Sequence, residues 1–356
     1  MRVEQVTPGR RVSGRLVDGV LTRDLVIGGK RWSKGRRLSA DDLLALGTTD
    51  PGPPVTVLLA EPGELHEDDA AIRLAKAVAG PNLEVRGPNQ SRLDLVASAD
   101  GVVTVLVPEL ERINRLDPLE VFTIFDGQIV EKGDLVASVK VAPHIVDGGV
   151  IDAAARLAGF GSQPVVWVSS FAHRRVGVVV KESIRAPARA KFEASVRAKV
   201  EGLGSKVLDI VYVHDEADAV ETAIARFTRG AETADLILTA GSASTDPRDT
   251  FFTAIDALGG RVVRRGVPAH PGSMLWLARV GGTSILGLPT CGAYSKATAV
   301  DLLLPRLLAG EPANERTVAK LGHGGILTRS QRFRFPRYAR ELDAPDGLTR
   351  RLAPRT

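Results

Sequence analysis

The alternation of apolar and polar positions changes character near residue 160. Before it, short apolar runs separated by turn dipeptides predict a strand-rich α+β domain over residues 1–150. After it, wholly apolar strands alternate with amphipathic segments at helical spacing. That order is typical of a largely parallel sheet with helices on both faces. We therefore predict the α/β fold class, with a three-layer αβα domain over residues 160–312.

Turn and capping signals locate the elements of the first domain. Gly28-Gly29 between two extended runs predicts a hairpin, and Ser39 is a suitable N-cap for a short helix. Residues 66–80 predict an amphipathic helix with acidic residues in its first turn. A β-meander is expected further on, turning at two dipeptides, Asp126-Gly127 and Gly133-Asp134. No group of residues in this half points to a binding or catalytic site.

The formal net charge of +5 is concentrated in one segment. Residues 329–355 contain eight arginines against three acidic residues, so this stretch alone carries +5 and the rest of the chain is near neutral. The stretch has little hydrophobic periodicity. We predict that residues 321–356 form a mobile basic tail rather than a nucleic-acid-binding arm, and we expect no nucleic-acid partner.

Composition favours a soluble, cytoplasmic protein. The apolar fraction of 44% suffices for a core, and no stretch reaches the roughly 18 uncharged apolar residues of a membrane span. The beginning of the chain has no apolar run of the kind that marks a secretory signal. The single cysteine, Cys291, cannot form an internal disulfide, which agrees with a reducing compartment. We expect cytoplasmic localisation and no membrane partner.

A loop of small and hydroxylated residues follows the apolar strand 236–238. Glycine lets the backbone approach a ligand, hydroxyls add donors, and the N-terminus of the next helix favours an anion. Asp246 and Pro247 predict the start of that helix as N-cap and first helical residue, with Asp249 as the acid of a capping box. Capping does not explain the small residues at 241–245. We therefore predict that this loop binds an anionic small molecule.

Two more loops follow predicted strands. The first fits a type II turn centred on Pro271 and Gly272. In the second, Gly292 would admit backbone donors to a phosphate that Lys296 could reach. Cys291, in the same loop, is alternatively a nucleophile, although no histidine stands near it in the sequence.

Acidic residues also stand at predicted strand ends. Glu182 comes directly after the apolar run 176–180, and Asp215 and Glu216 follow the next strand. Ligands of open α/β sheets bind beyond the carboxyl ends of the strands, where these residues would lie. The alternative for Asp215 and Glu216 is that they start a helix with favourable charge.

Taken in order, the loops resemble those of the molybdopterin-binding domain shared by molybdopterin molybdenumtransferases and molybdopterin adenylyltransferases, the MoeA/MogA group. Its first motif, T-x-G-G-x-S-x-G-x-x-D, is matched at four positions, Thr239, Gly241, Ser244 and Asp249. Its second and third motifs, P-G-K-P and G-L-P-G-N-P, are represented by residues 271–274 and 287–292. Residues 1–312 resemble, more closely, a divergent branch that is often joined to a molybdenum cofactor cytidylyltransferase.

The resemblance implies a ligand and a set of site residues. The ligand is molybdopterin, the molybdenum cofactor or its nucleotide form. Asp249 and Glu182 would be catalytic and would hold Mg²⁺. The residues implied at the ligand are Thr239, Gly241, Ser242, Ser244, Thr245, Asp246, Pro271, Gly272, Ser273, Pro289, Thr290, Cys291, Gly292 and Lys296.

The implied function is binding of molybdopterin in the biosynthesis, modification or delivery of the molybdenum cofactor. Two classes stay open: a transferase resembling the molybdenumtransferases or adenylyltransferases, and a carrier that needs only hydrogen-bond donors. The lysine of P-G-K-P and the Asn-Pro of G-L-P-G-N-P are missing, which favours binding over molybdate insertion. The implied partners are a molybdenum enzyme or a cytidylyltransferase, and a homodimer is a family expectation. The alternative outside the family is a nucleotide or sugar-phosphate binding enzyme on a similar sheet.

Overall fold

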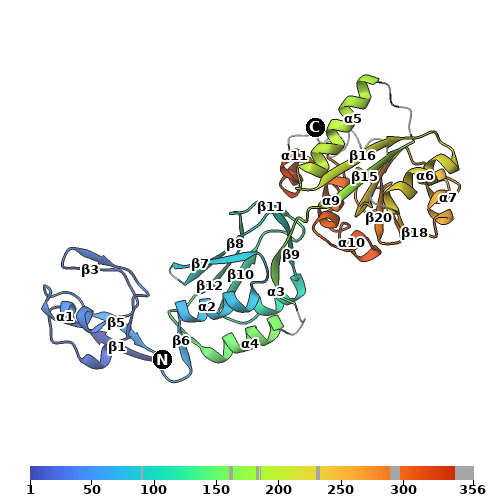
Figure 1. The fold of residues 1–356 in the computed structure, drawn as a ribbon. Helices are drawn as coiled ribbons and strands as arrows, with labels where there is room; N and C mark the ends of the chain where they lie inside the picture. Colours follow the sequence, from blue (N-terminus) through green and yellow to red (C-terminus); the bar gives the residue numbers. More distant parts are fainter. Residues whose placement is uncertain are drawn as a thin grey trace, which may run out of the picture. The chain divides into compact units, whose positions relative to one another are not determined.

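The computed structural model describes residues 1–89, 91–159, 163–181, 184, 186–229, 233–288 and 297–340. Its chain forms two compact units (Figure 1). Unit 1 comprises Met1–Ala99, Thr104–Asp126 and Lys132–Val168. Unit 2 comprises Asp100–Val103, Gly127–Glu131 and Ser169–Thr356.

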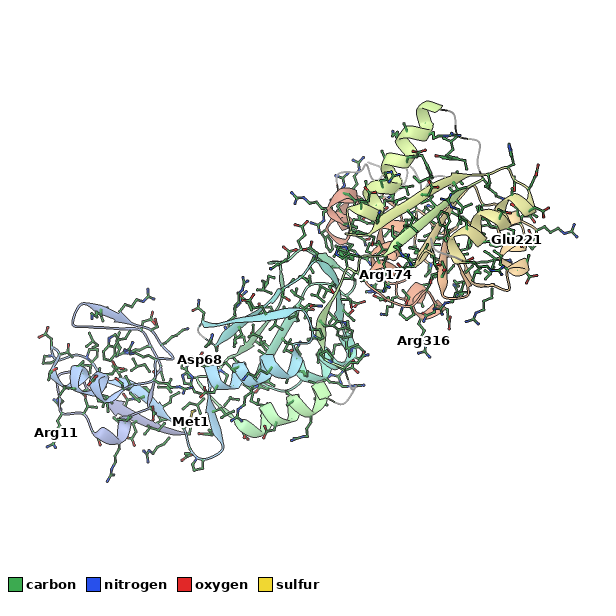
Figure 2. The ribbon with its side chains drawn as sticks, viewed as in Figure 1. Met1, Arg11, Asp68, Arg174, Glu221 and Arg316 are labelled. Atoms are coloured by element: carbon green, nitrogen blue, oxygen red, sulfur yellow. The ribbon has the colours of Figure 1, made fainter. Side chains whose placement is uncertain are left out.

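The beginning of unit 1 is a small antiparallel sheet with one helix. Its strands are ordered β1-β5-β2, namely Arg2–Val6, Val55–Leu59 and Val20–Leu21. The ammonium of Met1, a residue labelled in Figure 2, is held by the carboxylates of Glu61 and Glu64, at 2.8 and 2.6 Å. A short 3₁₀ turn, a hairpin and a helix complete this part: η1 (Gly14–Leu16), β3 (Leu25–Ile27), β4 (Lys30–Trp32) and α1 (Ala40–Thr48).

Two of the local predictions are confirmed in this part. The hairpin turns at Gly28 and Gly29, whose φ angles of +55° and +73° fall where glycine has no steric penalty. Ser39 caps α1, and a full capping box with Asp42 satisfies two backbone N–H groups at the helix start.

The rest of unit 1 is a four-stranded antiparallel sheet with helices. The strand order is β10-β12-β8-β7, namely Leu119–Thr123, Leu135–Val141, Arg92–Ala97 and Leu83–Asn89. The helices are α2 (Glu67–Val78), α3 (Val107–Asn114) and α4 (Gly148–Gly159). A separate two-stranded pair joins β6 (Glu64–His66) to β13 (Ile145–Asp147). The predicted strand-rich α+β architecture is therefore confirmed.

The predicted meander is wrong in its pairing. β10 pairs directly with β12, while the intervening β11 (Ile129–Val130) pairs with β9 (Gly101–Val105) in a sheet ordered β11-β9-β14. The turn at Asp126 explains why, because its carboxylate accepts a hydrogen bond of 3.0 Å from the backbone N–H of Val105. β14 (Val166–Ser170) also belongs to this three-stranded sheet, although its residues lie within the range 160–312 predicted for the αβα domain.

Unit 2 is built on a six-stranded sheet. Its order is β16-β15-β17-β20-β19-β18, namely Lys206–Tyr212, Arg175–Val180, Leu236–Ala240, Thr283–Leu288, Trp276–Val280 and Arg261–Arg265. The first four strands are parallel, and β19 is antiparallel to both of its neighbours, β20 and β18. The helices are α5 (Ala186–Glu201), α6 (Ala217–Thr228), α7 (Thr250–Ala257), α9 (Val300–Leu308) and α10 (Glu315–Ala319).

Alternate residues of the strands enter two separate cores, so the unit has three layers. Leu238 packs with Phe192 of α5 and Leu304 of α9. Its neighbour Ile237 packs on the other face, with Phe227 of α6 and other residues of α6 and α7. Successive side chains of a strand point to opposite faces, and both faces here are apolar because both are covered. The predicted αβα architecture is confirmed.

The described part of the predicted basic tail packs against the core of unit 2. Four apolar side chains between residues 321 and 340 are buried in the core that α5 and α9 share: Leu321, Leu327, Phe335 and Ala339. This segment includes η2 (Arg329–Arg334) and α11 (Arg337–Arg340). These positions, 321, 327, 335 and 339, are too irregularly spaced to form a helical or strand pattern, so the sequence did not indicate their burial. Residues 341–356 lie outside the described part.

Buried polar groups anchor the same segment. The Lys199 ammonium of α5 forms an ion pair with Asp301 of α9 in which both side chains are almost wholly buried. It also lies 5.5 Å from the ring centre of Tyr338. Burial, aided by the Asp301 carboxylate, raises the pKa of the Tyr338 phenol well above its ordinary value.

Within the residues that the structure describes, no helix is both long and apolar enough to cross a membrane.

Candidate functional site

The strand ends of unit 2 lie level at one edge of the sheet. The register pairs Val180 with both Tyr212 and Ala240, and Ala240 with Leu288. The residues that follow these strands therefore emerge side by side, which is where open α/β sheets bind ligands. We call this the carboxyl edge.

The loop from Gly241 to Asp249 folds back so that a backbone N–H near its start bonds to the side chain of its last residue. Gly241 has a φ of +92°, which turns the chain sharply out of β17. The Asp249 carboxylate accepts from the N–H of Ala243 at 2.6 Å and from that of Phe251 at 3.0 Å. Asp249 is therefore the N-cap of α7 and also the anchor of the loop.

This geometry corrects the predicted start of the helix. α7 begins at Thr250, not at Pro247, and Asp246 is not its cap. The Asp246 carboxylate accepts instead from the N–H of Arg248, at 2.8 Å, inside the loop. The anion at the helix N-terminus is thus the protein's own Asp249, so the helix end contributes less to an external anion than the sequence indicated.

A lysine that the sequence analysis did not single out lies beneath this loop. The Lys181 ammonium donates to Asp249 at 2.8 Å, to Asp215 at 3.0 Å and to the Thr250 hydroxyl at 3.0 Å. Its side chain is 4% exposed and that of Asp249 is 0% exposed, whereas that of Asp215 is 60% exposed. A lysine directly after five apolar strand residues was the available signal, because it must be paired if that position is buried.

The Asp215 carboxylate is stabilised in its charged form. The Thr250 hydroxyl donates to it at 2.6 Å, and this hydrogen bond lowers the pKa of Asp215 more than any other contact. Burial opposes this shift, and the hydrogen bond from Lys181 adds to it. Because the folded-state pKa is depressed, the resulting stability is present above the ordinary pKa of the carboxyl and is lost as pH falls through the lowered value.

We expect Thr250→Val to raise the pKa of Asp215 towards its ordinary value, because valine keeps the shape and removes the strongest hydrogen bond to the carboxylate. A ¹³C NMR titration of the aspartate carboxyls would measure the shift. Thr253→Val is the matched control, since the Thr253 hydroxyl bonds only to the backbone oxygen of Thr250 among the described contacts. An unchanged Asp215 titration in the Thr250 variant would contradict the assignment.

A tryptophan joins the first loop to the neighbouring strands. Trp276, at the start of β19, donates from its indole N–H to the Ser242 hydroxyl at 3.0 Å. Its ring lies against Gly287 of β20, where an added Cβ would fall 1.9 Å from the indole. The ring of Phe252 meets it edge-on, with ring centres 5.1 Å apart. Ser242 is thus positioned from β19 through a contact that the sequence did not indicate.

The second predicted loop is held by elements on both sides. The backbone oxygen of Pro271 accepts from the N–H of Ala299 at 2.9 Å. Gly272 has a φ of +105° and packs so closely on Ala299 that an added Cβ would clash. His270 is exposed but exchanges two backbone hydrogen bonds with Gly325 and Leu327. The C-terminal segment therefore fixes the loop containing Ser273.

The other predicted ligand residues differ in their accessibility. Thr239 is fully buried in β17, and no described group lies within hydrogen-bonding distance of its hydroxyl. Ser244 is half-buried, and Thr245 and Asp246 are exposed. Several predicted site residues lie outside the described part of the chain: Glu182, Pro289, Thr290, Cys291, Gly292 and Lys296.

The described residues do not fit the Mg²⁺ ion that the resemblance implied. Both oxygens of Asp249 are engaged, one with two donors, and one of those donors is a cation. Mg²⁺ binds oxygens at about 2.0–2.1 Å in an octahedron, and it cannot share these oxygens with an ammonium group in their midst. Over the described ranges, no group of three or more His, Cys, Asp or Glu side chains is arranged to hold a metal ion.

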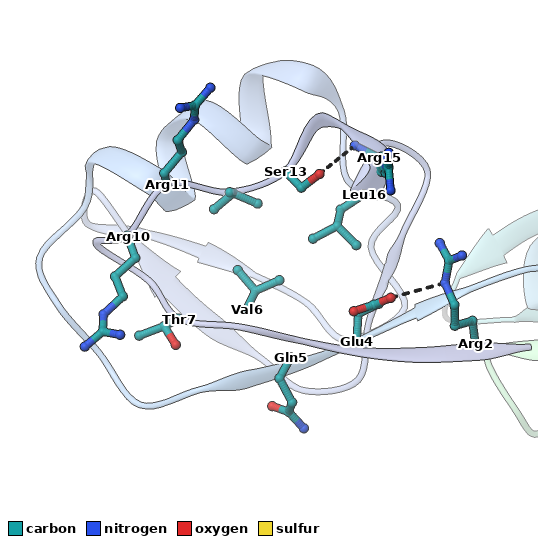
Figure 3. A pocket seen from close by; sticks show the side chains of 11 residues that line it. Arg2, Glu4, Gln5, Val6, Thr7, Arg10, Arg11, Ser13, Arg15 and Leu16 are labelled. Carbon is teal, nitrogen blue, oxygen red and sulfur yellow. Dashed lines mark hydrogen bonds and ion pairs between the residues drawn. The ribbon is translucent and has the colours of Figure 1, made fainter.

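A pocket of about 440 Å³ in unit 1 offers no comparable site. Four arginines line it, Arg2, Arg10, Arg11 and Arg15. Figure 3 shows that their guanidinium groups point in different directions and that Arg2 pairs with Glu4, at 3.2 Å. They do not converge on one anion, so the carboxyl edge of unit 2 remains the candidate site.

Comparison with known proteins agrees with this location. A family model described as "Probable molybdopterin binding domain" matches residues 181–309, and so confirms the resemblance recognised in the sequence. A search of curated proteins gave no match.

Two solved structures are similar to the chain. One is the molybdopterin biosynthesis MoeA protein from Pyrococcus horikosii, with 14% identity over 73% of this chain and 81% of that one, at a TM-score of 0.30. The other is molybdenum cofactor biosynthesis protein B, with 16% identity over 43% of this chain and 94% of that one, at a TM-score of 0.28. At these TM-scores, neither structure bears on the site.

Proposed function

We propose that unit 2 binds molybdopterin, or its molybdenum-loaded or nucleotide form, at the carboxyl edge of its sheet. The chain would then act in the biosynthesis, modification or delivery of the molybdenum cofactor. The observation that carries this proposal is the family match to residues 181–309, which begins at Lys181 and includes both described loops of the carboxyl edge.

The shape and polarity of the first loop support binding of an anionic group. Gly241 turns the backbone outwards, and the accessible Ser244 and Thr245 bring hydroxyl donors to the surface. Arg248 is exposed in the same loop and adds a positive charge suited to phosphate. The Asp249 carboxylate accepts a hydrogen bond from the N–H of Ala243, and the Ser242 hydroxyl accepts one from the Trp276 indole. These contacts fix the conformation of the loop before a ligand binds.

Between the two classes left open by the sequence, we favour a carrier. A transferase of the implied kind needs the Asp249 carboxylate for a metal ion or a proton. That carboxylate is wholly buried and already accepts from two backbone N–H groups and from Lys181. Binding through loop donors makes no demand on it.

We expect Thr245→Glu to weaken the binding of molybdopterin by about tenfold or more, because a carboxylate near a phosphate costs about 1 kcal/mol even in water and more near a protein surface. Equilibrium binding of molybdopterin to the purified full-length chain, under anaerobic conditions, measures this. The control is Thr253→Glu, which places the same charge at an exposed position of α7 outside the loop.

Two results would contradict the proposal. One is the absence of saturable binding by the unaltered protein at micromolar molybdopterin. The other is equal weakening by the two glutamate variants, which would place the ligand away from the loop. Displacement of molybdopterin by a simple nucleotide or sugar phosphate at similar concentration would favour the alternative class of ligand.

A further inference from the structure

The cluster beneath the first loop has the form of a cation site that is already filled. Asp215 and the adjacent pair Asp249 and Thr250 come from two separate places along the chain, and an oxygen of each residue lies 2.8–3.0 Å from the Lys181 nitrogen. Two carboxylates and a hydroxyl are hard oxygen ligands of the kind that bind divalent cations. Here the cation at their centre is an ammonium.

The hydrogen bonds of this ammonium are fully used. A lysine has three N–H donors, and Lys181 has three acceptors. The ring of Phe251 lies 5.3 Å from the nitrogen and covers it from a further side. Lys181 therefore keeps no donor for an external phosphate, and its charge acts on its own neighbouring carboxylates.

The position of Lys181 is set by the sheet. The residue follows β15, and its backbone N–H donates to the oxygen of Ala240 in β17, at 3.1 Å. The side chain therefore starts from a fixed point at the carboxyl edge. Withdrawing the ammonium to admit a metal would leave a positive charge without partners in a site where only 4% of the side chain is exposed.

We infer that Lys181 is a built-in cation that takes the place of a divalent metal ion at this edge, so that the unaltered protein binds no metal through Asp215 and Asp249. The inference goes beyond the proposed function, since it holds whatever ligand the loops bind. Its corollary is a latent metal site: removing the lysine side chain while keeping the three oxygens would leave two carboxylates and a hydroxyl around an open space.

Titration with Mn²⁺, followed by the electron paramagnetic resonance signal of the free ion, tests this without molybdopterin. We expect no one-to-one binding by the unaltered full-length chain up to about millimolar Mn²⁺, a range in which weak oxygen-ligand sites are already occupied. Lys181→Ala is expected to gain one site. Lys181→Met is the matched control, because it removes the charge but fills the space, and it should gain none.

Circular dichroism first establishes that each variant is folded. The double variant Lys181→Ala with Asp215→Asn should lose the gained site, which assigns that site to the cluster. One-to-one binding by the unaltered chain that disappears in Asp215→Asn would overturn the inference. So would a folded Lys181→Ala variant that binds no more Mn²⁺ than Lys181→Met. If Lys181→Ala does not fold, Mn²⁺ titrations of the unaltered chain and of its Asp215→Asn variant decide whether Asp215 and Asp249 bind a metal ion.

Discussion

Lys181→Met is expected to destabilise unit 2 by about 3–5 kcal/mol, which is the usual cost of removing one partner of a buried ion pair. The change leaves the Asp249 carboxylate wholly buried with two backbone donors but no counter-charge. Methionine fills a similar volume, so the loss is one of charge rather than of packing. Urea unfolding followed by circular dichroism measures the change in the free energy of unfolding.

A double-mutant cycle separates the pair from other effects of the substitution. Asp249→Asn retains an oxygen that can cap α7 but removes the buried charge, so adding it to Lys181→Met should recover part of the lost stability. Lys191→Met, on an exposed position of α5, is the control and should change stability by no more than about 0.5 kcal/mol. A loss below about 1 kcal/mol in Lys181→Met would mean that the ammonium does not neutralise Asp249.

Gly287→Ala is the second substitution with a large expected effect, a loss of about 3 kcal/mol or more together with weaker ligand binding. The new methyl group would lie 1.9 Å from the Trp276 ring. Gly287 cannot retreat, because β20 is paired with β17 on one side and β19 on the other. The indole must therefore move, at a free-energy cost near the upper end of the range usual for overpacking. Its hydrogen bond to Ser242, in the loop proposed to bind the ligand, would break.

Gly282→Ala is the matched control in the turn between β19 and β20. An added Cβ there meets nothing within 4 Å, and its backbone conformation is not left-handed. We expect it to be neutral or slightly stabilising. Combining Gly287→Ala with Trp276→Leu should recover part of the lost stability, because the smaller side chain makes room for the methyl group. Equal thermal unfolding midpoints for the two single glycine variants would contradict the expected clash.

Local signals in the sequence determined much of the fold. The apolar strands and the amphipathic segments between them were enough for the αβα layers, because burial on both faces of a parallel sheet requires that composition. Ser39 and Gly28-Gly29 located a helix start and a hairpin turn through interactions that reach only a few residues. The three loops, taken in order, were enough to identify the domain family.

Strand partners and buried contacts were decided by the tertiary structure. β11 leaves the expected meander to pair with β9, because a strand's partner depends on which edges are free in the folded unit. The apolar residues of segment 321–340 are too widely spaced to form a pattern, and they are buried only because α5 and α9 leave a surface for them.

The candidate site shows the same division. Sequence alone placed the first loop at a strand end and predicted Asp249 as the acid of a capping box, whereas the structure makes it the N-cap itself. Lys181 lies 34 residues from Asp215 and 68 from Asp249, and Ser242 lies 34 residues from Trp276. Such contacts leave no periodicity in the sequence, because they arise from the order of strands in the sheet. The sequence determined that a loop of small and hydroxylated residues stands at this edge, and only the tertiary structure decided that its buried aspartate already has a cation of its own.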